Sequence, residues 1–186
     1  MSKSCVVGFL ADLRSGDRMK QYEQIAQMAF DECRRSGAFN LDVDLRMKEV
    51  EGLPRGSGDD VVAAYEELAA EGAVAIIGPF VTDNCTYLKP TVERIGVPAI
   101  AWCGASSWLG RWTFSLPNGS LLDEGPYLAA YARRKGYRHV AVLRDASEIG
   151  DTYWRFFERA ARRYGLSISS NQAIEPLATD LSAEIR

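Results

Sequence analysis

Short apolar runs alternate with longer amphipathic stretches along most of the chain. The runs at 5–10, 73–77 and 97–102 are almost continuously apolar, which is typical of parallel strands buried on both faces. Residues 41–48 instead alternate strictly between apolar and charged side chains, which predicts a strand with one solvated face. We therefore expect 41–48 at an edge of the sheet and the continuous runs inside it.

The stretches between these strands have the apolar spacing of helices, which we expect at 18–36, 61–71 and 83–95. The first helix should face the sheet through Tyr22, Ile25, Ala26, Ala29 and Cys33. The expected helix caps are Asp59 or Asp60 for the second helix and Asp83 or Asn84 for the third. This alternation of strand and helix predicts an α/β fold with a doubly wound parallel sheet in the order 2-1-3-4.

That strand order itself predicts a ligand site. Ligands of doubly wound sheets bind outside the carboxyl ends of the strands, at the point where the strand order reverses. The loops that border this point are 13–17, 79–83 and 102–107, and each carries polar side chains. The topology therefore places a binding site at these loops before any motif is considered.

The pattern breaks at 108–120, where turn-forming and aromatic residues replace the regular alternation. We interpret this stretch as a crossover between two lobes, the first at 1–116 and the second beginning at 117 and running to 186. In the second lobe the pattern predicts helices at 123–135 and 151–164, strands at 139–143 and 166–174, and a last helix from about 179. Two strong strands cannot easily close a core, so we expect the chain to be an N-terminal fragment of a longer protein.

Composition excludes several classes of function. The formal net charge is -3, so no basic field favours nucleic acid. His139 is the only histidine, and neither a nucleophile elbow nor a zinc-protease motif occurs, so we expect no enzyme, no catalytic residue and no cofactor. The four cysteines lack metal-ligand spacing, so we also expect no metal site.

The cysteines and the start of the chain leave two questions open. Cys5, Cys33, Cys85 and Cys103 are widely spaced and are expected to be buried free thiols, although Cys85 and Cys103 lie on neighbouring loops where a disulfide is conceivable. Residues 1–4 lead directly into a strand without a secretory signal pattern. An exported protein that has lost its signal and a cytoplasmic protein both agree with this start.

Five blocks in order resemble the type I periplasmic binding proteins, especially the group that binds the branched-chain amino acids leucine, isoleucine and valine, and the related ligand-binding domains of receptors. They read VVGFLADLRSGD, DDVVAAYEELAAEGAVAIIGPFVTD, GVPAIAWCGASS, GPYLAAYARRKGYRHVAVLRDASEIGDTYWRFFERAARRYG and ATDLS. The resemblance covers nearly the whole chain. It implies a two-lobed α/β protein that holds a ligand between its lobes.

The resemblance also assigns candidate ligand-binding residues. Thr82 and Asp83 fall where the family places hydroxyls for a ligand carboxylate, and Ser106 is the corresponding hydroxyl of the second polar loop. Ile149 stands where amino-acid binders often carry an aromatic residue before a glycine, which argues against a standard amino-acid pocket. The complete candidate set is Arg14, Phe80, Thr82, Asp83, Trp102, Cys103, Gly104, Ser106, Glu148 and Ile149.

These candidates have different expected roles. Phe80, Trp102 and Ile149 are expected to supply apolar contact, and Arg14 to neutralise Asp83. The resemblance implies a periplasmic or extracellular protein that captures an amino acid, an amide or a related acid and delivers it to an ABC transporter permease. The alternative is the ligand-sensing input domain of a receptor or regulator, attached to a signalling domain.

Overall fold

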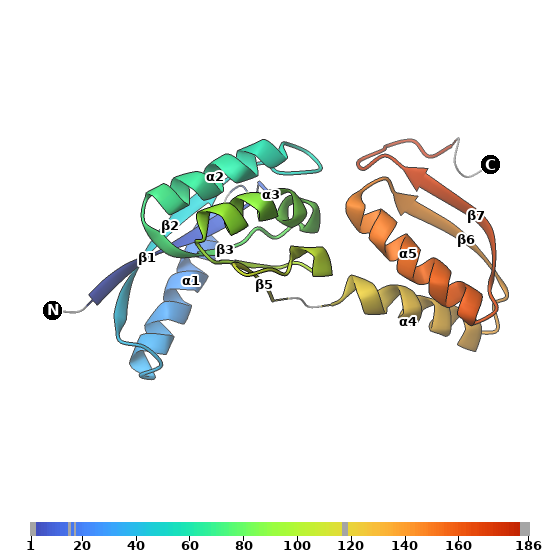
Figure 1. The fold of residues 1–186 in the computed structure, drawn as a ribbon, viewed down its shortest axis with the longest axis horizontal. Helices are drawn as coiled ribbons and strands as arrows, with labels where there is room; N and C mark the ends of the chain where they lie inside the picture. The colour runs from blue at the N-terminus through green and yellow to red at the C-terminus, as the bar shows by residue number, and fades with distance from the viewer. Residues whose placement is uncertain (1–2, 15, 17, 117–118, 183–186) are drawn as a thin grey trace. The chain divides into compact units, whose positions relative to one another are not determined.

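The computed structural model describes residues 3–14, 16, 18–116 and 119–182, with the side chains of Lys3 and Arg18 left out (Figure 1). The chain divides into two compact units. The first comprises Met1–Cys103 and Trp108–Leu116, and the second comprises Gly104–Ser107 and Pro117–Arg186. No helix among the described residues is long and apolar enough to span a membrane.

The first unit is built on a five-stranded parallel sheet in the order β2-β1-β3-β4-β5. Its strands are β1 (Lys3–Ala11), β2 (Leu41–Glu49), β3 (Ala73–Ile77), β4 (Ala99–Ala101) and β5 (Thr113–Ser115). The alternating residues of β2 lie at one edge, where one face of the strand meets solvent, while β1 is buried from Val7 to Ala11. The doubly wound α/β fold expected from the sequence is therefore present.

Strand β5 was not expected, because its residues lie in the stretch that we interpreted as a crossover. It is short, and it pairs with β4 in register, with Ile100 opposite Phe114. The Thr113 hydroxyl donates to the Trp108 carbonyl at 2.5 Å, and the Trp108 indole donates to the Phe114 carbonyl at 2.8 Å. These bonds hold the turn that follows the 3-10 helix Ser106–Trp108, so pairing and side-chain contacts rather than periodicity define this strand.

Helices α1 (Arg18–Arg35), α2 (Gly58–Ala70) and α3 (Thr82–Ile95) connect the strands, with α1 and α2 on opposite sides of the sheet (Figure 1). The expected cap of α2 was wrong. Ser57 caps this helix, because its hydroxyl accepts the Asp59 amide at 3.0 Å, and Asp59 and Asp60 lie in the first turn. The third helix ends at Gly96 as expected, with a left-handed φ of 81° that favours glycine.

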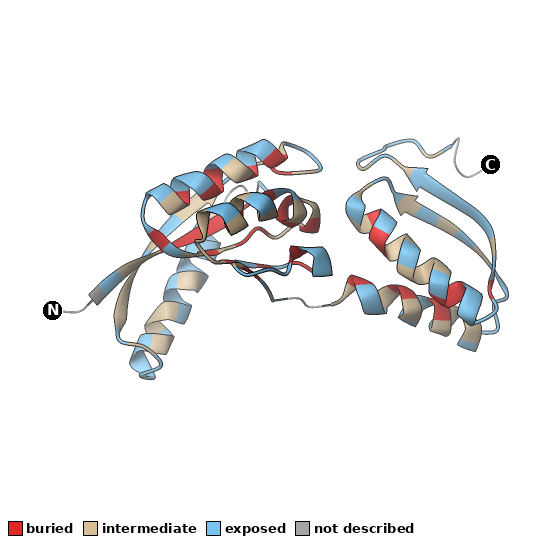
Figure 2. Cartoon of the chain, viewed as in Figure 1, coloured by how far each residue is buried: buried red, intermediate tan, exposed pale blue. Residues whose placement is uncertain are grey.

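The packing of α1 also differs from the expectation. No described residue of α1 is buried (Figure 2). Tyr22, Ile25 and Ala29 of the expected stripe are exposed. The core instead lies between the sheet and the inner sides of α2 and α3. Its largest fully buried side chains include Leu10, Tyr65, Leu68, Ile76, Leu88 and Trp108.

The second unit consists of α4 (Leu121–Arg134), β6 (His139–Asp145), α5 (Glu148–Arg163) and β7 (Ser167–Ile174). Strands β6 and β7 pair in parallel, and Ala129, Ala160, Ala161 and Leu166 form its buried cluster. Gly125 allows α4 and α5 to approach closely, since a Cβ there would lie 2.6 Å from the Phe157 amide nitrogen. Residues 179–182 form no helix, and the rest of the helix expected there lies outside the described residues.

Candidate functional site

The loop after β3 passes directly over the end of β1. Gly78 has a φ of 111°, and a Cβ at this position would lie 2.2 Å from the Leu10 carbonyl oxygen. A larger residue would therefore be both strained and in collision with the backbone. This glycine brings Phe80, Thr82 and Asp83 to the carboxyl end of β1, at the point where the strand order reverses.

Asp12, the first residue after β1, organises this loop. It is fully buried, and its carboxylate accepts the backbone amides of Phe80 at 2.8 Å and Val81 at 3.0 Å. It also accepts the side-chain amide of Asn84 at 2.7 Å. These three bonds satisfy a buried charge and fix the entry to α3, as a capping residue would.

The same network reaches the loop that precedes α2. The Asn84 oxygen accepts the Leu53 amide at 2.9 Å, and the Asp12 carbonyl accepts the Gly52 amide at 3.0 Å. Three loops at the carboxyl edge of the sheet are thus joined through two buried side chains. Asp12 was missed from the sequence, although a polar residue directly after a buried strand at the switch point was a usable signal.

The expected cap of α3 was wrong for this reason. The capping position is Val81, which provides no side-chain hydrogen bond, whereas Asn84 is buried in the network and Asp83 lies in the first turn. Thr82 is buried at the start of the helix, and its carbonyl accepts the Thr86 hydroxyl at 3.2 Å. The network occupies two amides near this helix end, so they are not available to a ligand anion.

The loop after β4 is tied to the loop after β3 at a single carbonyl. The Pro79 oxygen accepts both the Trp102 amide at 3.2 Å and the Cys85 thiol at 3.8 Å. The neighbouring Cys103 thiol and burial raise the pKa of Cys85. Trp102 is half exposed, so its indole is available at this edge.

Other candidates in the first unit have partners within it. Arg14 is largely exposed and forms an ion pair with Glu51, with 3.5 Å between Nε and Oε2. The ring of Phe80 packs against Phe9, with 5.5 Å between the centroids, so part of its apolar surface belongs to the core. The expected neutralisation of Asp83 by Arg14 stays a prediction.

The remaining candidates lie in the second unit. The Gly104 carbonyl accepts the Leu121 amide at 3.4 Å, and Ser106 is exposed at the start of the 3-10 helix. Helix α5 begins at Glu148 rather than at the expected Asp151, because the Ser147 hydroxyl accepts the Gly150 amide at 3.1 Å. Glu148 and Ile149 therefore occupy its first turn, exposed and half-buried respectively.

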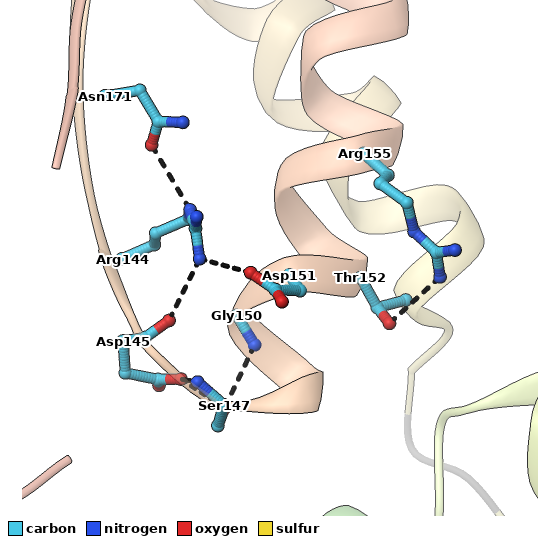
Figure 3. A network of polar contacts seen from close by, with 8 residues as sticks. All are labelled: Arg144, Asp145, Ser147, Gly150, Asp151, Thr152, Arg155 and Asn171. Carbon is cyan, nitrogen blue, oxygen red and sulfur yellow. Dashed lines mark hydrogen bonds and ion pairs between the residues drawn. The ribbon is translucent and has the colours of Figure 1, made fainter. Parts of the chain in front are cut away.

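A polar network holds the loop between β6 and α5 (Figure 3). The guanidinium of Arg144 donates to the Asn171 side-chain oxygen at 3.2 Å and forms an ion pair with Asp151. Asp145 accepts the Ser147 hydroxyl in the same loop. These contacts give the turn that carries Glu148 and Ile149 a defined shape. Within the described residues, no cluster of three or more histidine, cysteine or acidic side chains could hold a metal ion.

Comparisons with known proteins identify the fold independently. The chain matches the family model of the periplasmic binding proteins over residues 5–186. A comparison with curated proteins found no match.

Several solved structures have the same fold. One is a solute-binding protein of an ABC transporter from Rhodopseudomonas palustris BisB5 in complex with 3,4-dihydroxybenzoic acid, with a TM-score of 0.74 and 19% identity over 98% of this chain and 50% of that one. A leucine-binding protein from Thermotoga maritima MSB8 has a TM-score of 0.74 and 16% identity over 97% and 52%. A fatty acid ABC transporter substrate-binding protein from Thermomonospora curvata has a TM-score of 0.75 and 14% identity over 100% and 48%.

The chain spans about half the length of these solved structures. Identities this low show a shared fold and nothing about the ligand. The family match covers almost the entire chain and agrees with the parallel α/β architecture and the order of its strands. The chain belongs to the periplasmic binding protein family.

Proposed function

We propose that the whole protein is an extracytoplasmic solute-binding protein that captures a small organic ligand between two lobes and delivers it to an ABC transporter permease. Residues 1–116 contribute to the first lobe, and residues from 117 to 186 begin the second. Capture by lobe closure requires no covalent chemistry, so we propose a binding protein and not an enzyme. The observation that carries this proposal is the convergence of the Asp12 network and the Thr82 loop at the carboxyl edge of a sheet of this family.

The chemistry of this edge narrows the ligand class. Asp12 already uses two amides at the start of α3, and Asp83 places a second carboxyl group in the first turn. Two acidic groups near one helix end disfavour a bare carboxylate there, and they favour a hydrogen-bond donor. The half-exposed Trp102 offers an aromatic face to an apolar ligand body.

We therefore expect an amino-acid derivative, an amide or an aromatic acid whose donor group faces Thr82 and Asp83. Ile149 replaces the aromatic residue that amino-acid binders often carry, so a plain charged amino acid fits less well. Relatives of this fold were solved with aromatic acids, including 4-hydroxybenzoate and benzoate. They support an aromatic ligand as one candidate class.

The test titrates the full-length protein with leucine, leucinamide, benzoate and 4-hydroxybenzoate, followed by calorimetry and tryptophan fluorescence. The variants Thr82→Ala and Ser106→Ala should each weaken binding about tenfold or more, because each removes a hydrogen bond to the ligand. Thr91→Ala is the matched control, since Thr91 lies in the third turn of α3. Unchanged affinity in both site variants would remove this assignment, and tight binding of plain leucine would contradict the role given to Ile149.

A further inference from the structure

We propose that Cys85 and Cys103 are a redox-active thiol pair that closes to a disulfide, linking the first turn of α3 to the loop after β4. The proposal does not depend on ligand binding, because its evidence lies within the first unit. It concerns a covalent modification of the loops that carry the candidate site.

Cys85 and Cys103 are both buried beside the Pro79 carbonyl. Cys85 is 0% exposed and Cys103 is 1% exposed, and neither forms a disulfide in the structure. The Cys85 thiol and the Trp102 amide share the Pro79 carbonyl, which places the residue before Cys103 at the same atom that Cys85 contacts. The effect of Cys103 on the pKa of the Cys85 thiol agrees with a close approach of the two side chains.

The backbones on either side are anchored as well. The Cys85 amide donates to the Val81 carbonyl at 3.0 Å within the first turn of α3. The Cys103 carbonyl accepts the hydroxyl of Ser115 on β5. These bonds fix the backbones of both residues, so a disulfide requires the side chains to rotate and not the chain to move. The native fold therefore keeps the two backbones beside the shared Pro79 carbonyl, and proximity of this kind is needed for a disulfide.

The other two cysteines do not share this arrangement. Cys5 is on β1 and Cys33 is near the end of α1, and both are only half-buried. They serve as internal comparisons, because they lie on separate elements and are more accessible to solvent than Cys85 and Cys103.

The reaction needs a disulfide oxidant. One thiolate of the pair attacks a small disulfide R–S–S–R and releases R–SH, and the second cysteine then displaces the remaining R–S group as another R–SH. Two electrons and two protons pass from the cysteines to the oxidant, and one S–S bond forms as one breaks. The neighbouring Cys103 thiol and burial raise the pKa of Cys85, which disfavours its thiolate in the folded state, so the bond forms mainly during folding or transient opening.

The disulfide would close a covalent loop of residues 85–103, which contains most of α3 and all of β4. Cross-linking residues 85 and 103 restricts the unfolded chain and leaves the folded geometry in place. We expect the oxidised protein to have a Tm about 5 °C or more above that of the reduced protein. Reduction should reverse the shift.

The experiment refolds the full chain from the reduced, unfolded state with a mixture of a small thiol and its disulfide, followed by non-reducing peptide mapping. The double variant Cys5→Ser/Cys33→Ser, which retains only the proposed pair, should give one intramolecular link between 85 and 103 and the same rise in Tm. Cys103→Ala should lose both.

Two results would overturn the proposal. If the double variant emerges with both thiols open to alkylation, or linked only between molecules, the pair is not redox-active. A link that forms but leaves Tm unchanged or lower would show that the fold does not accommodate the bond. The mapping of the double variant decides the question even if Cys103→Ala does not fold.

Discussion

Replacing Asp12 tests whether one buried carboxylate organises the carboxyl edge of the first sheet. Its oxygens accept hydrogen bonds from the Phe80 amide, the Val81 amide and the Asn84 side chain. In Asp12→Ala these three donors lose their acceptor, and Asn84 keeps only its bonds to Leu53. In Asp12→Asn the shape is retained, but an NH2 group replaces one oxygen and faces donors.

The size of the effect follows from these bonds. Each hydrogen bond to a charged group contributes roughly 1.5 to 3 kcal/mol, so three bonds set an upper bound of roughly 4.5 to 9 kcal/mol. Removing the carboxylate also removes the cost of burying a charge, which offsets several kcal/mol of this sum. We therefore expect Asp12→Ala to lower the free energy of unfolding by about 3 to 5 kcal/mol, and Asp12→Asn by about 2 to 4 kcal/mol.

Urea denaturation followed by tryptophan fluorescence measures this loss, since Trp102, Trp108 and Trp112 all lie in the first unit. Asp44→Ala is the matched control. Asp44 is an exposed aspartate on β2 that pairs with Arg46, and surface pairs of this kind contribute about 1 kcal/mol or less. If Asp12→Ala costs no more than Asp44→Ala, the network does not organise this edge.

Three further substitutions test individual contacts. Tyr65→Phe removes a 2.5 Å hydrogen bond to the Val97 carbonyl and should lower the free energy of unfolding by about 1 kcal/mol. Burial raises the pKa of Tyr65 to about 12, so the stability from its neutral phenol is complete below pH 10.0 and is lost as pH rises through about 12. Denaturation at a series of pH values should show this decline in the wild type and a weaker decline in the variant. Ser57→Ala should cost about 1 kcal/mol in thermal unfolding by removing the α2 cap, and Ser57→Asp should restore most of it. Gly125→Ala should lower Tm, because the new methyl group would meet the backbone of α5 and overpacking costs about 1 to 3 kcal/mol. This cost exceeds the gain of about 1 kcal/mol in helix propensity. A raised Tm would mean that α4 and α5 can separate freely.

The sequence predicted those parts of the fold in which local periodicity and burial agree. Strands β1 and β3 are continuous apolar runs inside the sheet, and β2 alternates because it is an edge, so both patterns were readable. Strand β5 escaped prediction because it is too short to show a period and is defined by its pairing with β4 and by the side-chain bonds of Thr113 and Trp108. The stripe on α1 was predicted from correct spacing, but spacing does not report whether anything covers the helix.

The sequence predicted the location of the candidate site but not the side chain that organises it. Topology located the loops after β1, β3 and β4, since the carboxyl ends of parallel strands lie at one edge. The cap of α3 was not predictable, because the side chain that performs it, Asp12, is 68 positions from Phe80 in the sequence. Neighbouring residues suggest local caps, whereas the fold uses a carboxylate from the loop after β1.

The exposure of α1 sets it apart from the strand that precedes it. Amide hydrogens of α1 should exchange with solvent through small local openings, whereas those of β1 should exchange only when the whole unit opens. Ile25 and Met28 are 63% and 69% exposed, so any molecule or segment that covers them would add apolar burial where there is now little. Slower amide hydrogen exchange in α1 would therefore report the binding of any molecule or segment that covers this helix.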